Sequence, residues 1–89
     1  MKIEKGFSKE EVISEIGMPQ NKQFHGRDEA WQYCSMGFSV DDHLIVWFYD
    51  GHVTGMQTYI VTTGVGMCRD FKTIRWEDAP DRSIEFRLR

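Results

Sequence analysis

The residues whose types are best suited to catalysis are a cysteine and a histidine, Cys34 and His43. A thiolate beside an imidazole base is the nucleophile of thiol enzymes. However, Cys34 falls in the middle of a predicted strand and His43 at the edge of a predicted loop, and no predicted helix begins near Cys34 to activate its thiol. We therefore predict that the chain has no catalytic residues and is not an enzyme.

The other polar side chains do not form a recognisable metal or cofactor site. The three histidines fall in predicted turns, and the two cysteines lack the close paired spacing of zinc sites. Asp41 and Asp42 have a simpler role, because aspartate is a common turn residue. The Gly-Val-Gly run at residues 64–66 follows a strand but lacks the remaining features of a phosphate-binding loop. We predict no bound metal and no cofactor.

Cys34 and Cys68 are the only cysteines in the sequence. Two cysteines are compatible with one disulfide in an oxidising compartment or with two free thiols in a reducing one. Isolated cysteines usually behave as small, buried, hydrophobic residues, which favours two buried free thiols. The sequence leaves the compartment open.

The size and composition of the chain indicate one small globular domain, residues 1–89. The chain has 89 residues, of which 40% are hydrophobic and 28% charged. A net charge of −3 argues against a non-specific nucleic-acid binder, which would present a basic surface. No stretch reaches the ~18 apolar residues of a membrane span, and no leader is visible. Any membrane attachment would therefore require a lipid anchor that this sequence does not contain.

Residues 7–19 carry the start and stop signals of one short helix, and the rest of the domain must be organised around it. Ser8 and Glu11 have the spacing of a capping box, in which each side chain binds the other's backbone N–H. Gly17 and a proline two residues later provide the stop signal. The helix has one apolar stripe, which must pack on a sheet and consists of Val12, Ile13 and Ile16.

The sheet that receives this stripe is predicted to be an antiparallel meander. Residues 20–24, 29–36, 44–49 and 53–62 are rich in β-branched and aromatic residues, with turn residues between them. Asp50 and Gly51 suit a tight hairpin turn, so we predict that the strand 44–49 pairs with 53–60. Gly55 within the second strand indicates either a bulge or a site where a side chain crosses the backbone.

Strand 44–49 has bulky apolar residues on both faces, so both faces need a cover. If Leu44, Val46 and Phe48 face the helix, then Ile45, Trp47 and Tyr49 face away from it. We predict that the tail, residues 63–89, covers this second face, since monomers rarely expose large apolar patches. A partner protein or a second copy of the chain is the alternative cover. Within the tail we predict a short helix over residues 67–74, an edge strand over 84–88, and cover by Met67, Phe71, Trp76 and Phe86.

The predicted fold class is therefore α+β: a short N-terminal helix packed on one face of a three- or four-stranded antiparallel meander, with a C-terminal tail over part of the sheet. Four short motifs occur in the sequence in a particular order and spacing. They are Gly-Phe-Ser-Lys-Glu-Glu-Val at residues 6–12, Gly-Met-Pro at 17–19, Glu-Ala-Trp-Gln-Tyr at 29–33 and, after the strand 44–48, Asp-Gly-His-Val at 50–53.

In this arrangement the chain resembles the SmpA/OmlA (BamE-like) family of small envelope lipoproteins, and its helix motif resembles that of the β-lactamase-inhibitor-protein fold. The resemblance covers residues 6–62 and excludes the tail. It implies a helix-on-meander fold and a non-catalytic role in outer-membrane assembly or maintenance. It also implies a location at the periplasmic face of the outer membrane if a leader has been removed. Otherwise we expect the protein in the cytoplasm.

Two functional hypotheses follow. The first is a protein-interaction or scaffold domain whose partner, a protein or a second copy of the chain, binds a face containing Trp47, Tyr49 and Tyr59, because aromatic residues dominate binding hot spots. For Trp47 itself, packing under the tail is the competing interpretation. The alternative hypothesis is a small ligand-binding protein or enzyme with a pocket between sheet and tail near Cys34, His43 and Cys68.

Overall fold

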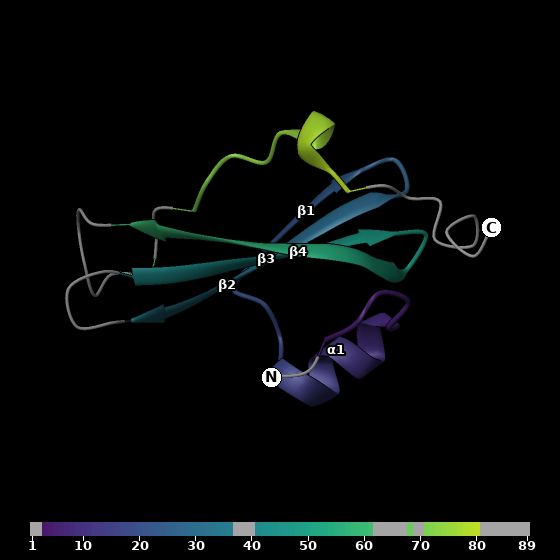
Figure 1. The fold of residues 1–89 in the computed structure, drawn as a ribbon, viewed down its shortest axis with the longest axis horizontal. Helices are drawn as coiled ribbons and strands as arrows, with labels where there is room; N and C mark the ends of the chain where they lie inside the picture. Colours follow the sequence, from purple (N-terminus) through teal and green to yellow (C-terminus); the bar gives the residue numbers. More distant parts are fainter. Residues whose placement is uncertain (1–2, 37–40, 62–67, 69–70, 81–89) are drawn as a thin grey trace.

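The computed structural model describes residues 3–36, 41–61, 68 and 71–80. Within these ranges the chain is α+β, with one α-helix and a four-stranded antiparallel sheet in the order β1-β2-β3-β4 (Figure 1). This confirms the predicted fold class at that level. The elements are α1 (Lys9–Ile16), β1 (Asn21–His25), β2 (Asp28–Met36), β3 (Asp41–Tyr49), β4 (His52–Val61) and a 3₁₀ turn, η1 (Trp76–Asp78).

The helix begins and ends where the sequence predicts. The Ser8 hydroxyl accepts the Glu11 N–H at 3.2 Å, and the Glu11 carboxylate accepts the Ser8 N–H at 2.7 Å, which completes the capping box. Gly17 has a φ of 82°, and its N–H donates to the Ile13 carbonyl. This conformation suits glycine and stops the helix after eight residues.

The β3–β4 hairpin also has the predicted turn and register. Asp50 and Gly51 both have positive φ, as a two-residue hairpin turn requires, and Tyr49 pairs with His52. Strand β3 begins earlier than predicted, however, because Asp41 and the two residues after it pair with both β2 and β4 instead of forming a loop. The pairing on both sides outweighs the poor strand propensity of aspartate.

The helix covers one face of the sheet and forms the larger apolar core there. Val12 of α1 is fully buried against Val46 and Phe48 of β3, with Trp31 of β2 beside them. The ring centroids of Trp31 and Phe48 are 4.6 Å apart. Ile13 and Ile16 are partly buried against the same cluster, so the whole predicted stripe is in contact with the sheet.

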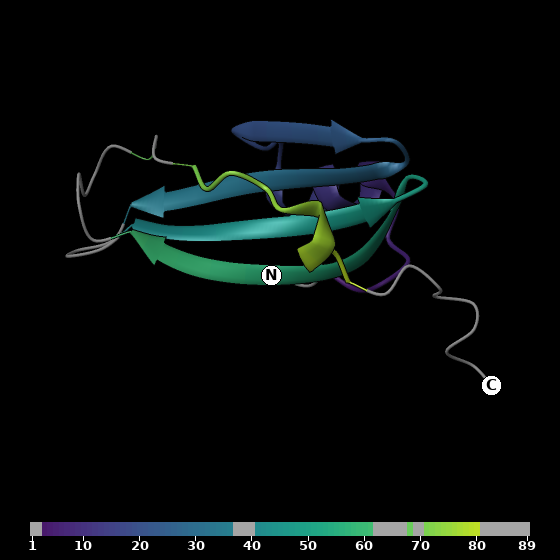
Figure 2. The same cartoon turned by 90° about the horizontal axis from the view of Figure 1, so that it is seen from above.

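Residues 71–80 of the tail lie against the opposite, outer face of the sheet (Figure 2). Ile45 and Trp47 of β3 form a second core with Ile74, and Trp76 packs on its edge. The indole N–H of Trp47 donates to the Gln57 side chain at 2.7 Å, which satisfies its one polar atom. The predicted contributions of Met67 and Phe86, and the predicted edge strand at 84–88, lie outside the described residues.

The predicted short helix over residues 67–74 is wrong for its described part. Residues 71–74 are extended, and the tail's helical turn comes later, at η1. The reason is hydrogen bonding: the N–H of Lys72 donates to the Tyr59 hydroxyl and its carbonyl accepts from the Gln32 side chain. Side chains of the sheet thus satisfy backbone groups that a helix would have satisfied internally.

Gly55 combines both roles that its position suggests. Trp47 pairs with Gly55 and Phe48 pairs with Val53, so Thr54 is the extra residue of a bulge in β4 beside Gly55. The ring of Pro80 lies directly over Gly55. A Cβ on Gly55 would lie 2.8 Å from Pro80 Cγ, closer than carbon atoms can pack. The absence of a side chain at position 55 is therefore what lets the tail sit against the sheet.

Gly55→Ala should displace Pro80 and lower the free energy of unfolding by about 1–3 kcal/mol, the usual cost of overpacking. Urea unfolding followed by tryptophan fluorescence measures this change. Thr58→Ala, at an exposed position of the same strand, is the control and should change stability by less than about 0.5 kcal/mol. A Gly55→Ala protein as stable as the wild type would contradict the observed contact.

Candidate functional site

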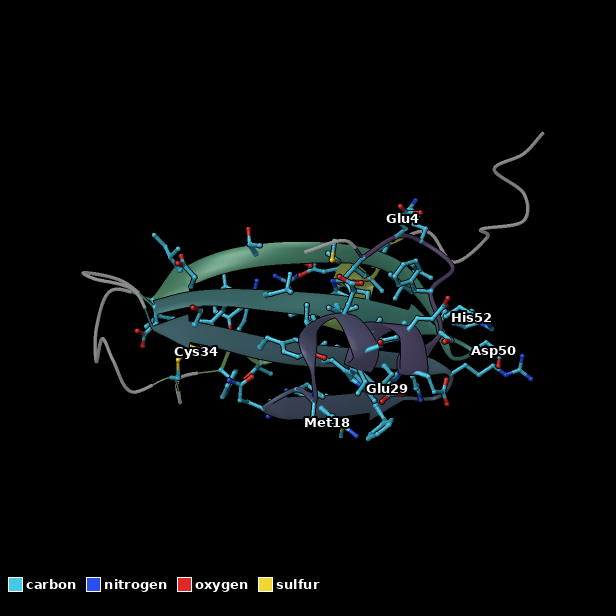
Figure 3. The ribbon with its side chains drawn as sticks, turned by 90° about the horizontal axis from the view of Figure 1, so that it is seen from below. Glu4, Met18, Glu29, Cys34, Asp50 and His52 are labelled. Carbon is cyan, nitrogen blue, oxygen red and sulfur yellow. A yellow bond between two sulfur atoms is a disulfide. The ribbon has the colours of Figure 1, made fainter. Side chains whose placement is uncertain are left out.

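An apolar cavity lies on the helix side of the sheet, beyond the last turn of α1. Its volume is about 480 Å³. Figure 3 shows the helix over only part of this face, with the end of the sheet near Cys34 left uncovered. The side chains that form it come from the end of α1 and from β2, β3 and β4, and include Ile16, Tyr33, Leu44, Thr58 and Ile60.

The cavity exists because the helix is shorter than the strand beneath it. Eight helical residues span about 12 Å, whereas the nine residues of β3 span about 30 Å. The helix-side residues nearest the turn at Asp50 are therefore covered, and those towards the other end of the sheet are not. Ile60 remains 60% exposed as a result. This length mismatch is visible in the sequence and is the signal that could have predicted the cavity.

Tyr33 lines the cavity and is hydrogen-bonded to the end of the helix. Its hydroxyl donates to the Gly17 carbonyl at 2.7 Å, so it caps a backbone group that the helix leaves without an internal partner. Burial raises the pKa of Tyr33 to about 12, because the phenolate would lose solvation there. The cavity therefore has a neutral aromatic wall at physiological pH.

Asp42 supplies a negative charge to the rim of the cavity. It lines the cavity and is exposed to solvent. Cys34 and His43 also line it, which meets part of the expectation of a pocket near these residues. Most of the lining residues, however, lie on the helix side of the sheet, whereas the expectation placed the pocket between sheet and tail.

The interpretation of Cys34 and Cys68 as free thiols is wrong. The two residues form a disulfide, with Cα atoms 5.7 Å apart, inside the usual range for such a bond. Antiparallel pairing places Cys34 at the far end of β2, where the tail passes, and that proximity is not visible in the spacing of the two cysteines. The disulfide attaches the beginning of the tail to the sheet.

Cys34 and His43 are brought together, but not as a free nucleophile and base. They are opposite one another in the β2–β3 pairing, and His43 Nε2 lies 3.7 Å from Cys34 Sγ. The sulfur is already bonded to Cys68, so it is not available as a thiolate in this state. The His43 ring is buried, stacked on Tyr59 with a centroid distance of 4.5 Å, and Phe71 of the tail packs on its edge.

The three residues suggested as a partner-binding face lie in different environments. Trp47 is only 2% exposed, under Ile74 and Trp76, which agrees with packing beneath the tail. Tyr49 and Tyr59 are half-buried. The Tyr59 hydroxyl donates to the Gln32 side chain and accepts from the Lys72 N–H. Burial raises the pKa of Tyr59, and the hydrogen bond from Lys72 opposes part of that rise.

The other two histidines, His25 and His52, contact different residues from those around His43. The ring of His25 stacks on Trp76, and His52 Nδ1 lies 3.1 Å from the Asp50 carbonyl. An ion pair joins the partly exposed Lys9 side chain of the helix to the buried Glu29 carboxylate of β2, which also accepts the indole N–H of Trp31. Nothing in the sequence pattern predicted this pair, since Glu29 occupies an ordinary strand position.

No protein-family model, curated protein or solved structure matches this chain. Among the described residues, no helix has the length and apolar character needed to cross a membrane.

Removing the disulfide should lower the free energy of unfolding by about 4 kcal/mol, because the bond closes a long loop, with a sequence separation of 34 residues. Chemical unfolding of the wild type and of a Cys34→Ser/Cys68→Ser variant measures this difference. A phosphine reductant should destabilise the wild type and leave the variant unchanged. Equal stability of the oxidised and reduced wild type would contradict this role.

The Tyr33 phenol should ionise with a midpoint near pH 12, whereas an ordinary tyrosine ionises near 10.0. Because the folded-state pKa is the higher one, the protonated phenol stabilises the fold fully below about pH 10, and this contribution is lost as the pH rises towards 12. NMR titration of ¹³Cζ-labelled tyrosines measures the midpoint, with Tyr33→Phe assigning the signal. A Tyr33 midpoint at the ordinary value would contradict its burial.

Proposed function

We propose that this domain is a non-catalytic protein-interaction domain of the bacterial cell envelope, similar in role to the SmpA/OmlA (BamE-like) lipoproteins of outer-membrane assembly or maintenance. The single observation that carries the proposal is the apolar cavity on the helix side of the sheet. We propose the cavity as the partner-binding site in place of the predicted face around Trp47, because Trp47 is buried by the chain's own tail.

The chemistry of the cavity indicates the kind of partner. Leu44, Ile16 and Ile60 offer aliphatic surface and Tyr33 an aromatic wall, so the cavity suits one or two bulky apolar side chains. Asp42 is the acidic residue among those that line the cavity, and it is exposed. We therefore propose a protein segment that carries an apolar side chain next to a lysine or arginine.

The disulfide supports the proposed compartment. Disulfides persist in oxidising environments, which include the bacterial periplasm, and are rare in the cytosol. A bond between Cys34 and Cys68 that attaches the tail to the sheet is therefore consistent with a domain that works outside the cytoplasm. This favours the envelope location that the family resemblance implies over the cytoplasmic one.

A second candidate function is the binding of a small apolar molecule. The volume of about 480 Å³ lies within the range of small-molecule sites, roughly 300–1,000 Å³. The two candidates differ in what they need at the rim. A partner segment extends beyond the cavity and interacts with Asp42, whereas a small apolar ligand needs only the cavity walls.

The test is selection of peptide ligands from a displayed random library against the oxidised domain, followed by NMR mapping. Selected peptides should contain an apolar residue beside a lysine or arginine and should shift the amide signals of Tyr33, Leu44 and Ile60. Ile60→Asp should weaken binding by at least about tenfold, because it puts a charge on the apolar surface. Asp42→Asn should weaken binding of the basic peptides specifically.

Phe24→Asp is the matched control, since Phe24 is a comparably exposed apolar residue, 65% exposed, on β1 and outside the cavity. It should leave peptide binding unchanged. Peptides that bind with equal affinity to Ile60→Asp, or that shift only signals of the outer face, would overturn the proposal. Concentration-dependent shifts of the same residues without any peptide would indicate a second copy of the chain as the occupant, and would overturn it as well.

A further inference from the structure

A cluster of potential metal ligands lies at the end of the sheet where the tail begins. Cys34 Sγ, Cys68 Sγ and a carboxylate oxygen of Asp41 lie within 4.8 Å of one another. His43 Nε2 adds a fourth group, 3.7 Å from Cys34 Sγ. The four residues come from β2, from β3 and from the tail, so only the folded chain brings them together.

One separation within this cluster, between Cys34 Sγ and His43 Nε2, fits that of a tetrahedral zinc site. With Zn–S bonds of about 2.3 Å and Zn–N bonds of about 2.0–2.1 Å, sulfur and nitrogen ligands stand about 3.6 Å apart at the tetrahedral angle. The observed separation of Sγ and Nε2 is 3.7 Å. In the same geometry two thiolates stand about 3.8 Å apart, so the sulfurs must separate on reduction of the disulfide.

The surroundings hold two of these ligands in place. His43 is 2% exposed, and its ring is fixed by stacking on Tyr59. Its Nδ1 is buried and has no hydrogen-bond partner among the described residues. Among the described residues, the polar contact of the ring is therefore with a sulfur atom, an unusual environment for a buried imidazole. Asp41 is 1% exposed, and its carboxylate accepts the Cys68 N–H at 3.2 Å.

We propose that the reduced protein binds one zinc ion through the Cys34 and Cys68 thiolates, His43 Nε2 and the Asp41 carboxylate. Two thiols bind the ion with release of two protons, since zinc binds thiolates. A disulfide-bearing oxidant then converts the site: the two zinc-bound thiolates give it two electrons, it takes two protons from the solvent and becomes two thiols, the Cys34–Cys68 bond forms, and Zn²⁺ leaves. The zinc form thus precedes the disulfide form in a newly made chain.

The zinc proposal does not depend on the proposed partner, although Cys34 and His43 also line the cavity, because it concerns the sulfur atoms and the imidazole ring of His43. In both states the same residues connect the tail to the sheet. The zinc ion would supply, before oxidation, the attachment that the disulfide supplies afterwards.

The test uses the whole chain, reduced with a phosphine and kept free of oxygen, with Zn²⁺ in competition with a chromophoric chelator and Co²⁺ as the spectroscopic probe. The reduced protein should bind one ion per chain at least about 10²-fold more tightly than the oxidised protein. The cobalt form should show the intense visible bands of a tetrahedral site and thiolate-to-cobalt charge transfer. Equal affinity of the two forms, or the weak spectrum of octahedral cobalt, would overturn the proposal.

Variants of matched shape assign the ligands. His43→Phe keeps a ring to stack on Tyr59, and Asp41→Asn keeps an acceptor for the Cys68 N–H. Each should weaken zinc binding by about tenfold or more and change the cobalt spectrum. The controls are His52→Phe and Asp42→Asn, which make the same chemical changes outside the cluster and should leave zinc affinity unchanged. Unchanged affinity in both cluster variants would overturn the four-ligand assignment.

Discussion

Strand β3 carries bulky apolar side chains on both of its faces, and the need to bury both sets determines the architecture of this small domain. On one side Val46 and Phe48 are buried against the stripe of α1, and on the other Ile45 and Trp47 are buried beneath the tail. Successive side chains of a strand point to opposite faces of the sheet, so a strand with apolar residues at every position needs cover on both faces. The described residues of this small chain therefore form three layers: the helix, the sheet and residues 71–80 of the tail (Figure 1).

The two covering layers are held by different means. The helix is stabilised by its own caps and by an apolar stripe, as amphipathic helices usually are. The described part of the tail has only one short helical turn, so its backbone groups depend on the sheet: Gln32 and Tyr59 bind Lys72, and the disulfide fixes its beginning. The side chains of the sheet's outer face thus act as hydrogen-bond partners for the tail as well as packing surface. The cavity on the helix side exists because this face of the sheet is only partly covered: a helix of eight residues is too short to extend over all of it.

Much of the fold follows from local signals in the sequence. The capping box at Ser8, the stop at Gly17 and the turn at Asp50 each depend on residues close in the chain, and each is found where it is predicted. The assignment of faces along β3 follows from simple alternation. The disulfide, the Lys9–Glu29 ion pair and the extended tail depend on residues far apart in sequence, and local propensity gave no information about them. The resemblance to envelope lipoproteins rests on the same local motifs. It therefore bears more directly on the fold of residues 6–62 than on their function, which stays a prediction.

The most direct test of the account is NMR measurement of nuclear Overhauser effects from the indole protons of Trp47 in the oxidised protein. Cover by the tail predicts strong effects to the methyl groups of Ile74 and to the Trp76 ring, whose centroid lies 6.0 Å from that of Trp47. It also predicts slow exchange of the Trp47 indole N–H, which Gln57 accepts. A Trp47 ring with no effects to residues 71–80 and a rapidly exchanging N–H would contradict the account.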